Sequence, residues 1–299
     1  LAPGDGVWQH LAQTVLADYA ANTAVLVLLV GLGTAFIGTG AAWLVVMYRF
    51  PGRSVLEWAL ILPLAAPAYV LAYAYTDLLQ VSGPVQSWFR DFTGLGARDY
   101  WFPPVRSLGG AAAIFTLVLY PYVYLLARAA FLAQGACVVE ASRTLGARPW
   151  PSVARVVLPL ARPAIAAGVA LALMETLADY GTVAYFGVPT FTTGIVRAWA
   201  SLQSPSAAAQ LSLTLLGFVV LVVALERTAR GGRRFHNAGS KLRSIPPTAL
   251  TGLRGAAATI ACALPVALGF LVPAAALLSL WAETGLDLDR RYFDLVWHS

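Results

Sequence analysis

Residues 140–163 read EASRTLGARPWPSVARVVLPLARP and lie between two long apolar runs of the chain. The first six residues are typical of a short helix, and Gly146 follows where a left-handed turn would end it. Pro149 and Pro151 favour a second short helix, because proline is tolerated in a first helical turn. The stretch therefore predicts two short helices, set at an angle, between two membrane spans.

The composition of the whole chain also indicates a membrane protein. Of its 299 residues, 59% are hydrophobic and 11% are charged, and the mean hydropathy is +0.71. A soluble domain carries about 25% charged residues, so this chain cannot cover a globular surface with polar groups. The formal net charge is +6, but most basic residues are arginines between apolar runs, which favours membrane topology over nucleic-acid binding. We expect an all-α, polytopic membrane protein.

Six segments are long enough to cross a bilayer, which takes about 20 residues in a helix. Their Ala, Leu and Val content favours helices over barrel strands. The first span contains Gly31, Gly33, Gly38 and Gly40, small residues that permit close helix contact. The expected spans are approximately 23–48, 56–79, 109–132, 160–186, 207–225 and 255–281.

The arginines predict the orientation of the spans. One set of connections holds 14 of the 20 basic residues and the opposite set holds 6. Because positive charge concentrates in the cytoplasm, the connections around Gly52, Gly146 and Arg233 are expected inside, and both chain ends outside. The quoted stretch is then cytoplasmic.

The spacing within the quoted stretch resembles the EAA loop of ABC-importer permeases, whose pattern is EAA-x3-G-x9-I-x-LP. Ser142 replaces the second alanine of that pattern and Val156 replaces its isoleucine. In that family the loop is a coupling helix that docks on the cytoplasmic ATPase. A basic loop that binds anionic lipid is the alternative, but it does not require these glycine and proline positions. The resemblance implies ATPase coupling by Glu140, Ala141, Ser142, Leu145, Gly146, Val156, Leu158 and Pro159.

Segments 50–79, 120–131 and 173–199 are similar to the iron(III) branch of these permeases. The resemblance implies the type I ABC-importer permease fold in a bacterial inner membrane. It implies four partners: a cytoplasmic ABC ATPase dimer, a periplasmic substrate-binding protein, a second permease half and the lipid bilayer. The chain itself would need no cofactor, since ATP binds to the partner subunit. Thiamine, phosphonate-type and polyamine permeases share much of this layout, so the cargo has alternatives.

Members of the iron(III) branch commonly fuse two homologous halves. The chain begins with Leu1 rather than Met and ends in mid-segment, so we expect a fragment of a longer protein. The expected parts are a periplasmic segment (1–22), a first permease domain with five spans (23–226), a basic cytoplasmic linker (227–254), and the first helix of a second half (255–299).

Other function classes lack their residues. The three histidines lie outside the spans, and neither HExxH nor GxSxG occurs, so an intramembrane protease or metal hydrolase is disfavoured. Lys241 is the only lysine and no P-loop surrounds it, so ATP hydrolysis belongs to a partner. A gated channel would not need the EAA-like loop. Cys137 and Cys262 have no metal-ligand spacing and are expected to fill space in the core.

Charged residues at membrane depth are candidates for the translocation path. Glu175 and Asp179 are spaced i, i+4 and would share a helical face, either lining the path or fixing helix packing. Tyr73 and Asp77 have the same spacing. Tyrosine and carboxylate oxygens suit ferric ion, but tyrosine near a span end is more often an interfacial residue. Tyr69, Tyr120 and Tyr124 extend this pattern, and no resident metal site is expected.

Overall fold

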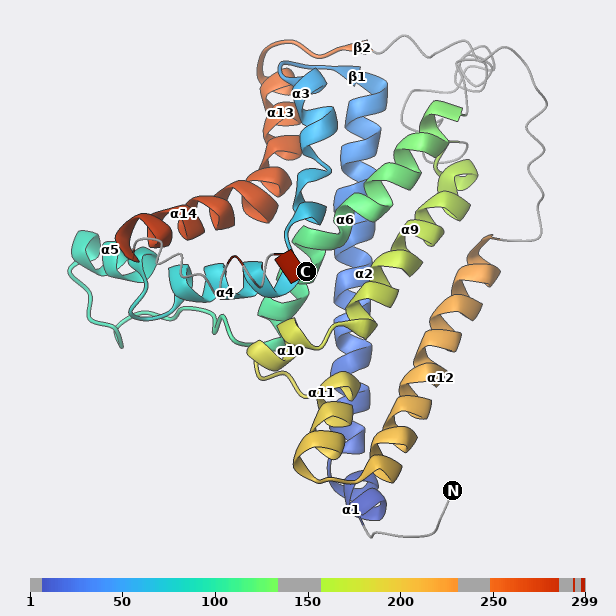
Figure 1. The fold of residues 1–299 in the computed structure, drawn as a ribbon. Helices are drawn as coiled ribbons and strands as arrows, with labels where there is room; N and C mark the ends of the chain where they lie inside the picture. The colour runs from blue at the N-terminus through green and yellow to red at the C-terminus, as the bar shows by residue number, and fades with distance from the viewer. Residues whose placement is uncertain (1–6, 134–156, 231–247, 285–292, 294–296, 299) are drawn as a thin grey trace.

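A computed structural model describes residues 7–133, 157–230, 248–284, 293 and 297–298 (Figure 1). Helices dominate this part of the chain, and its only strand pairing is a parallel, two-residue contact between β1 (Tyr48–Arg49) and β2 (Thr248–Ala249). Five helices are long and apolar enough to cross a membrane, and a sharply bent pair adds a possible sixth crossing. The expected all-α, polytopic fold is confirmed.

The helices before the first undescribed stretch are α1 (Val7–Thr14), α2 (Leu16–Met47), α3 (Arg53–Ala59), the 3-10 turn η1 (Leu62–Ala65), α4 (Ala68–Leu79), α5 (Pro84–Thr93) and α6 (Leu108–Ala133). Those after it are α9 (Leu158–Ala178), α10 (Gly181–Tyr185), α11 (Phe191–Val196), the π-helical turn η3 (Arg197–Ser201), α12 (Pro205–Arg230), α13 (Gly252–Val266), the π-helical turn η4 (Ala267–Leu271) and α14 (Val272–Thr284).

The centre of the bundle is α6, with α2 on one side and α9 on another (Figure 1). Both neighbours approach it through a glycine. A Cβ atom at Gly38 would lie 2.7 Å from Val123 Cβ, and one at Gly168 would lie 2.7 Å from Val123 Cα. The close contact expected of the first span is therefore confirmed at Gly38. Gly40 faces no atom within 4 Å and has no such role.

The second span is not the single helix expected over 56–79. The chain breaks between η1 and α4, and the direction of segment 68–93 differs by 93° from that of 53–65. Pro63 and Pro67 explain the break, because proline has no N–H for the helical ladder and restricts the residue before it. Ala66 accordingly has extended backbone angles.

The helix of the fourth span ends earlier than expected. We predicted 160–186, but α9 stops at Ala178 and the chain folds back through α10 and α11. Asp179 has extended backbone angles and its side chain bonds to the next turn, which ends the helix. The helix of the first span, in contrast, begins at Leu16 rather than near residue 23.

Three clusters of buried core side chains lie along the bundle. The inner core contains Tyr120, Tyr124 and Phe131, and a middle core contains Phe115, Leu71 and Leu177. A third core, which joins α1, α2, α11 and α12, contains Leu11, Tyr19, Phe191 and Leu211. Helix α13 belongs to the inner core, because Ala258, Cys262 and Val266 are buried there. Cys262 thus fills core space as expected, although the assignment of α13 to a second permease half stays a prediction.

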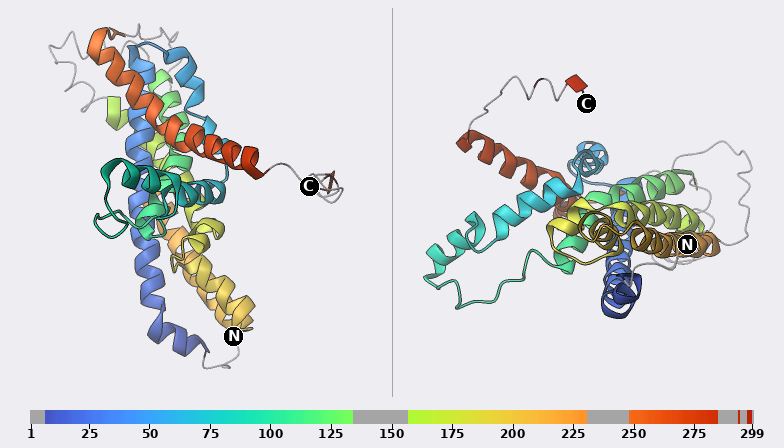
Figure 2. Two further views of the ribbon diagram at one scale, coloured as in Figure 1. Left: turned by 90° about the vertical axis from the view of Figure 1, so that its left-hand side faces the viewer. Right: turned by 60° about the horizontal axis from the view of Figure 1, so that its bottom comes forward.

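The chain reversals fall at two ends of the bundle. The end of α6 and the starts of α9 and α13 lie at the same end as the β1–β2 contact, which we call the inner end (Figure 1). Helices α1 and α11 lie at the opposite, outer end, and the side view agrees (Figure 2). Among the described residues, Arg49 lies in β1 and Arg53 begins α3 at this inner end.

Candidate functional site

A cluster of tyrosines joins α4 to α10 on the outer part of the molecule. The rings of Tyr69 and Tyr73 contact that of Tyr185, with centroid separations of 5.5 and 6.2 Å. The guanidinium carbon of Arg106 lies 4.7 Å from the centroid of the Tyr185 ring, a cation–π geometry. Tyr69 and Tyr73 remain exposed in the isolated chain. We call these four residues the tyrosine cluster.

A groove of ≈ 530 Å³ adjoins this cluster. Both Arg106 and Tyr185 line it, together with polar side chains of α4 and α5 and the chain that precedes α6. Arg106 has no carboxylate within ion-pair distance among the described residues. The groove therefore presents an exposed positive charge against an aromatic wall.

The two predicted acidic residues of the fourth span have different surroundings. Glu175 lies in the last turn of α9, and its side chain is exposed. Asp179 is the residue that ends the helix, and its N–H still donates to the Glu175 carbonyl at 3.1 Å, so a shared face for the two carboxylates stays a prediction. The Asp179 carboxylate accepts hydrogen bonds from the backbone N–H and the hydroxyl of Thr182, at 2.8 and 3.1 Å. That carboxylate holds a turn.

Asp77 lies in the last turn of α4, and its closest described polar partner is the Gln80 side-chain amide at 3.5 Å. Its carboxylate is therefore largely free to meet another group. Tyr73 and Asp77 share α4, as their spacing predicted, whereas Glu175 comes from α9. Three of the four predicted path residues, Tyr73, Asp77 and Glu175, therefore have side-chain oxygens that can still accept further hydrogen bonds.

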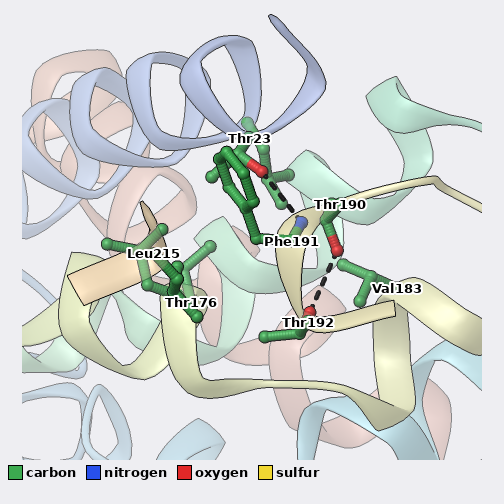
Figure 3. Close-up of a pocket in the computed structure, with 9 residues that line it drawn as sticks. Thr23, Thr176, Val183, Thr190, Phe191, Thr192 and Leu215 are labelled. Atoms are coloured by element: carbon green, nitrogen blue, oxygen red, sulfur yellow. Dashed lines mark hydrogen bonds between the residues drawn. The ribbon is translucent and has the colours of Figure 1, made fainter. Parts of the chain in front are cut away.

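Threonines hold the fold-back after α9, a feature that the sequence analysis missed. Figure 3 shows Thr23 of α2 facing the backbone N–H of Phe191, at 3.4 Å, and the hydroxyls of Thr190 and Thr192 3.0 Å apart. The Thr192 hydroxyl also donates to the Asp179 carbonyl, at 3.0 Å. The signal in the sequence was the run PTFTTG at 189–194, in which Thr190 and Thr193 cap α11 reciprocally.

The pocket between these threonines is small. Its volume of ≈ 10 Å³ is about that of one water molecule, and Leu26, Leu177 and Leu215 complete its wall (Figure 3). Two of its four threonine hydroxyls, those of Thr176 and Thr192, already donate to carbonyl oxygens. This site therefore ties α11 to α2 and α9 and has no room for a cargo ion with its ligands.

Tyr120 and Tyr124 do not belong to the tyrosine cluster. Both are fully buried in the inner core, where the Tyr124 hydroxyl donates to the Glu57 carbonyl at 2.8 Å. The hydroxyl of Tyr120 has no hydrogen-bond partner among the residues that the structure describes. Across the described ranges, no group of three or more His, Cys, Asp or Glu side chains could hold a metal ion.

Most of the expected coupling residues lie outside the described part of the chain: Glu140, Ala141, Ser142, Leu145, Gly146 and Val156. Leu158 and Pro159 are described, and they form the first turn of α9. Val157, just before them, is buried in the inner core, while Leu158 is 38% exposed. The motif thus ends where α9 enters the bundle, at the same end as the last residue of α6 (Figure 1).

Several bonds fix the helices at the inner end. Glu57 of α3 and Arg128 of α6 form a salt bridge, and their side chains are 19% and 26% exposed. Arg53 Nε donates to the Val45 carbonyl at the end of α2, at 2.6 Å. Arg128 lies about a turn and a half before the end of α6. The salt bridge therefore joins α3 to the helix that precedes the predicted coupling motif in the sequence.

The α3–α6 contact also has an unsatisfied group. The Nε of Arg128 is buried without a hydrogen-bond partner in the described structure. Thr259 of α13 donates to the Pro51 carbonyl at 2.8 Å, so α13 is bonded to the turn that precedes α3. The inner end is therefore a frame of four helices, α2, α3, α6 and α13, joined by specific polar bonds.

Comparison with known proteins identifies the family to which the chain belongs. Residues 34–227 match the family described as binding-protein-dependent transport system inner membrane component, and the chain belongs to that family. The expected permease class, in place of an enzyme class, and the inner-membrane location are thereby confirmed.

Individual relatives transport different cargoes. The chain is 29% identical over 224 residues to the Fe(3+)-transport system permease protein FbpB 2 of Haemophilus influenzae, covering 75% of this chain and 40% of that protein. It is 30% identical over 200 residues to the sulfate transport system permease protein CysT of Escherichia coli, covering 64% and 69%. The molybdenum permease ModB of Escherichia coli is 28% identical over 186 residues, covering 60% and 78%.

Solved structures share the fold. A bacterial ABC transporter involved in import of the acidic polysaccharide alginate matches with a TM-score of 0.59 at 18% identity, over 76% of this chain and 84% of its own. The inward-facing MetNI methionine ABC transporter matches with a TM-score of 0.53 at 18% identity, over 74% and 97%. The expected ABC-importer permease fold is confirmed.

Proposed function

We propose that this chain forms membrane-spanning helices of an ABC importer that carries ferric iron across the inner membrane. The family assignment supports import that depends on a separate binding protein. The match to an iron(III) permease over three quarters of this chain supports the cargo. A periplasmic substrate-binding protein would deliver iron to the outer end, and a second permease half, fused or separate, would complete the path.

The observation that carries the proposal is the place of the motif. Leu158 and Pro159 begin α9 at the inner end, beside the end of α6, so residues 134–156 connect two central helices there. A cytoplasmic ATPase dimer that grips Glu140, Ala141, Ser142, Leu145 and Gly146 would push on both helices together. Since Gly38 and Gly168 press α2 and α9 against the same residue of α6, these three helices would move as one body.

The path itself would run past Glu175, Tyr73 and Asp77, whose oxygen atoms are hard donors for ferric ion. A permease has to release its cargo, so scattered weak contacts serve it better than a closed metal site. A second cargo class, an oxyanion such as sulfate, is favoured by Arg106 in the groove of ≈ 530 Å³ and by the match to CysT.

The test is uptake by the complete reconstituted complex, loaded with ferric iron or with sulfate through the binding protein. Iron uptake without sulfate uptake supports the first cargo, and the reverse result replaces it.

Gly146→Val and Glu140→Ala should both remove coupled ATP hydrolysis and uptake while the protein still inserts, because a β-branched side chain opposes a left-handed turn and the carboxylate suits a helix start. Arg233→Ala in the linker is the control. Full coupling in Gly146→Val would refute the coupling role.

A further inference from the structure

Helix α5 has its polar face turned toward the protein. Gln86 is only 5% exposed, and its side-chain amide donates to the Leu79 carbonyl at 2.7 Å. The Tyr100 hydroxyl donates to the same side chain, at 2.7 Å. Arg90 donates to the Val81 carbonyl at 2.8 Å and to the Ser87 hydroxyl at 3.0 Å. The polar groups of this helix therefore find partners within the protein.

The opposite face of α5 is apolar and uncovered. Val85, Trp88, Phe89 and Phe92 follow the i, i+3, i+4, i+7 spacing of a single helical stripe. Trp88 is 66% exposed and Phe92 is 79% exposed, and their rings stack with centroids 5.7 Å apart. This arrangement is the reverse of a helix on a water-soluble surface, where the apolar stripe would face inward.

The direction of α5 follows from the break in the second span. Segment 68–93, which contains α5, is turned by 93° from segment 53–65. Segment 53–65 begins at the inner end and runs along the bundle, while α4 and α5 extend sideways from it (Figures 1 and 2). A helix at a right angle to a crossing segment lies along the plane of the membrane.

We propose that α5 is an in-plane helix whose Val85, Trp88 and Phe92 side chains insert into the headgroup–acyl boundary of the outer leaflet. The arginine distribution assigns the connection between the second and third spans to the outer side. Tryptophan and phenylalanine are the side chains that favour this boundary. The exposed stripe carries no charge, whereas exposed Asp91 lies off the stripe, where headgroups and water can solvate it.

Lipid fits this face better than a protein partner does. A protein interface has a polar rim with hydrogen-bonding groups around its apolar centre. On α5 three of the polar groups that could form such a rim, Gln86, Ser87 and Arg90, are already bonded within the molecule, and exposed Asp91 is the remaining charged one. The inference concerns α5 alone and does not depend on the cargo or on the coupling loop.

The test is the depth of spin labels at single cysteines. Trp88→Cys, Phe92→Cys and the matched control Asp91→Cys would be made in the full protein with Cys137 and Cys262 replaced by serine and alanine. Each variant would be reconstituted in vesicles of phosphatidylethanolamine and phosphatidylglycerol. The ratio of collision rates with oxygen and with nickel-EDDA should be several-fold higher at 88 and 92 than at 91.

Two results would overturn the inference. A ratio at 92 equal to or below that at 91 would mean that the stripe faces water. An immobilised label at 88 and 92 that neither reagent reaches would mean that protein covers the stripe, either the second permease half or the binding protein. Because the labels report depth without any transport, failure of the proposed function leaves this measurement valid.

Discussion

The inner and outer ends of this molecule are held together in different ways. At the inner end, four helices meet through a salt bridge, side-chain bonds to backbone carbonyls and fully buried tyrosines. At the outer end, the chain runs through short helices, α10, α11 and the turn η3, joined by threonine hydroxyls and one aspartate. Tyr69, Tyr73 and Tyr180 are exposed, whereas Tyr19 is buried against α11.

The difference matches two mechanical tasks. A region that receives force from a partner must move as a body, which close packing and polar cross-links favour. A region that opens for cargo needs segments of lower local stability, and short helices separated by turns are segments of this kind. We therefore expect substitutions at the inner end to lower global stability, and those at the outer end to act locally or on transport alone.

The largest loss of stability is expected at the contact between α2 and α6. In Gly38→Val, the new side chain would meet Val123 and the backbone of Tyr120 at distances below 3 Å, so the helices must separate. Overpacking of this kind costs about 1–3 kcal/mol. Thermal unfolding of the purified protein should show a lower midpoint, and Gly40→Val, which meets no atom, should leave it unchanged. Equal effects of the two substitutions would contradict the conclusion that close packing of α2 against α6 stabilises the bundle.

The salt bridge at the inner end should give the next largest effect. Glu57→Gln removes the charge that pairs with Arg128, and loss of a partly buried, charge-assisted bond costs about 1–3 kcal/mol. Chemical denaturation should report this loss, together with fewer cargo ions moved per ATP. Glu283→Gln, at the exposed end of α14, is the control. The double variant Glu57→Arg with Arg128→Glu should recover part of the loss, and no recovery would argue against a direct pair.

A smaller and local effect is expected at the outer turn. Asp179→Ala removes the acceptor for the Thr182 N–H and hydroxyl, a capping role that is worth about 0.5–2 kcal/mol. Hydrogen exchange should become faster across residues 180–193 while the global melting midpoint stays the same. Asp77→Ala, whose one described contact is long, should change neither quantity. A shift of the global midpoint in Asp179→Ala would show that the outer end is not an independent local unit.

The smallest effect on stability is expected at Glu175. Its exposed side chain makes no hydrogen bond or ion pair to any other described residue, so Glu175→Gln should change the free energy of unfolding by less than about 0.5 kcal/mol. Uptake of cargo should fall, since the substitution removes a charge from the proposed path. Reduced yield with unchanged uptake would instead indicate a packing role.

The number of spans and their approximate positions could be predicted because hydropathy is a local property of the chain. The exact helix limits could not. Pro63 and Pro67 were visible in the second span, but an apolar segment with prolines can bend or stay straight depending on its neighbours. The early end of α9 depends on a side-chain bond to Thr182, three residues further on. The i, i+4 spacing alone therefore placed Asp179 inside the helix, whereas it is the residue that ends the helix.

The candidate site was predicted in part. Tyr73, Asp77 and Glu175 keep free or exposed groups, but the contact of the α4 tyrosines with Tyr185 and Arg106 required the folded chain. The salt bridge at the inner end joins residues 71 positions apart, and no spacing rule links them. The bond from the Phe191 N–H of α11 to the Thr23 hydroxyl of α2 joins residues 168 positions apart.

By itself, the sequence determined the class of protein: apolar runs specify spans, arginines specify sides, and the spacing from Glu140 to Pro159 specifies the resemblance. These signals are local, because each depends on the free energy of single segments in water or lipid. The tertiary structure alone decided that segment 68–93 turns by 93° from segment 53–65, that the polar face of α5 points inward, and that two glycines meet Val123 from different helices. Those features depend on which distant residues come into contact, and a linear sequence does not display contacts.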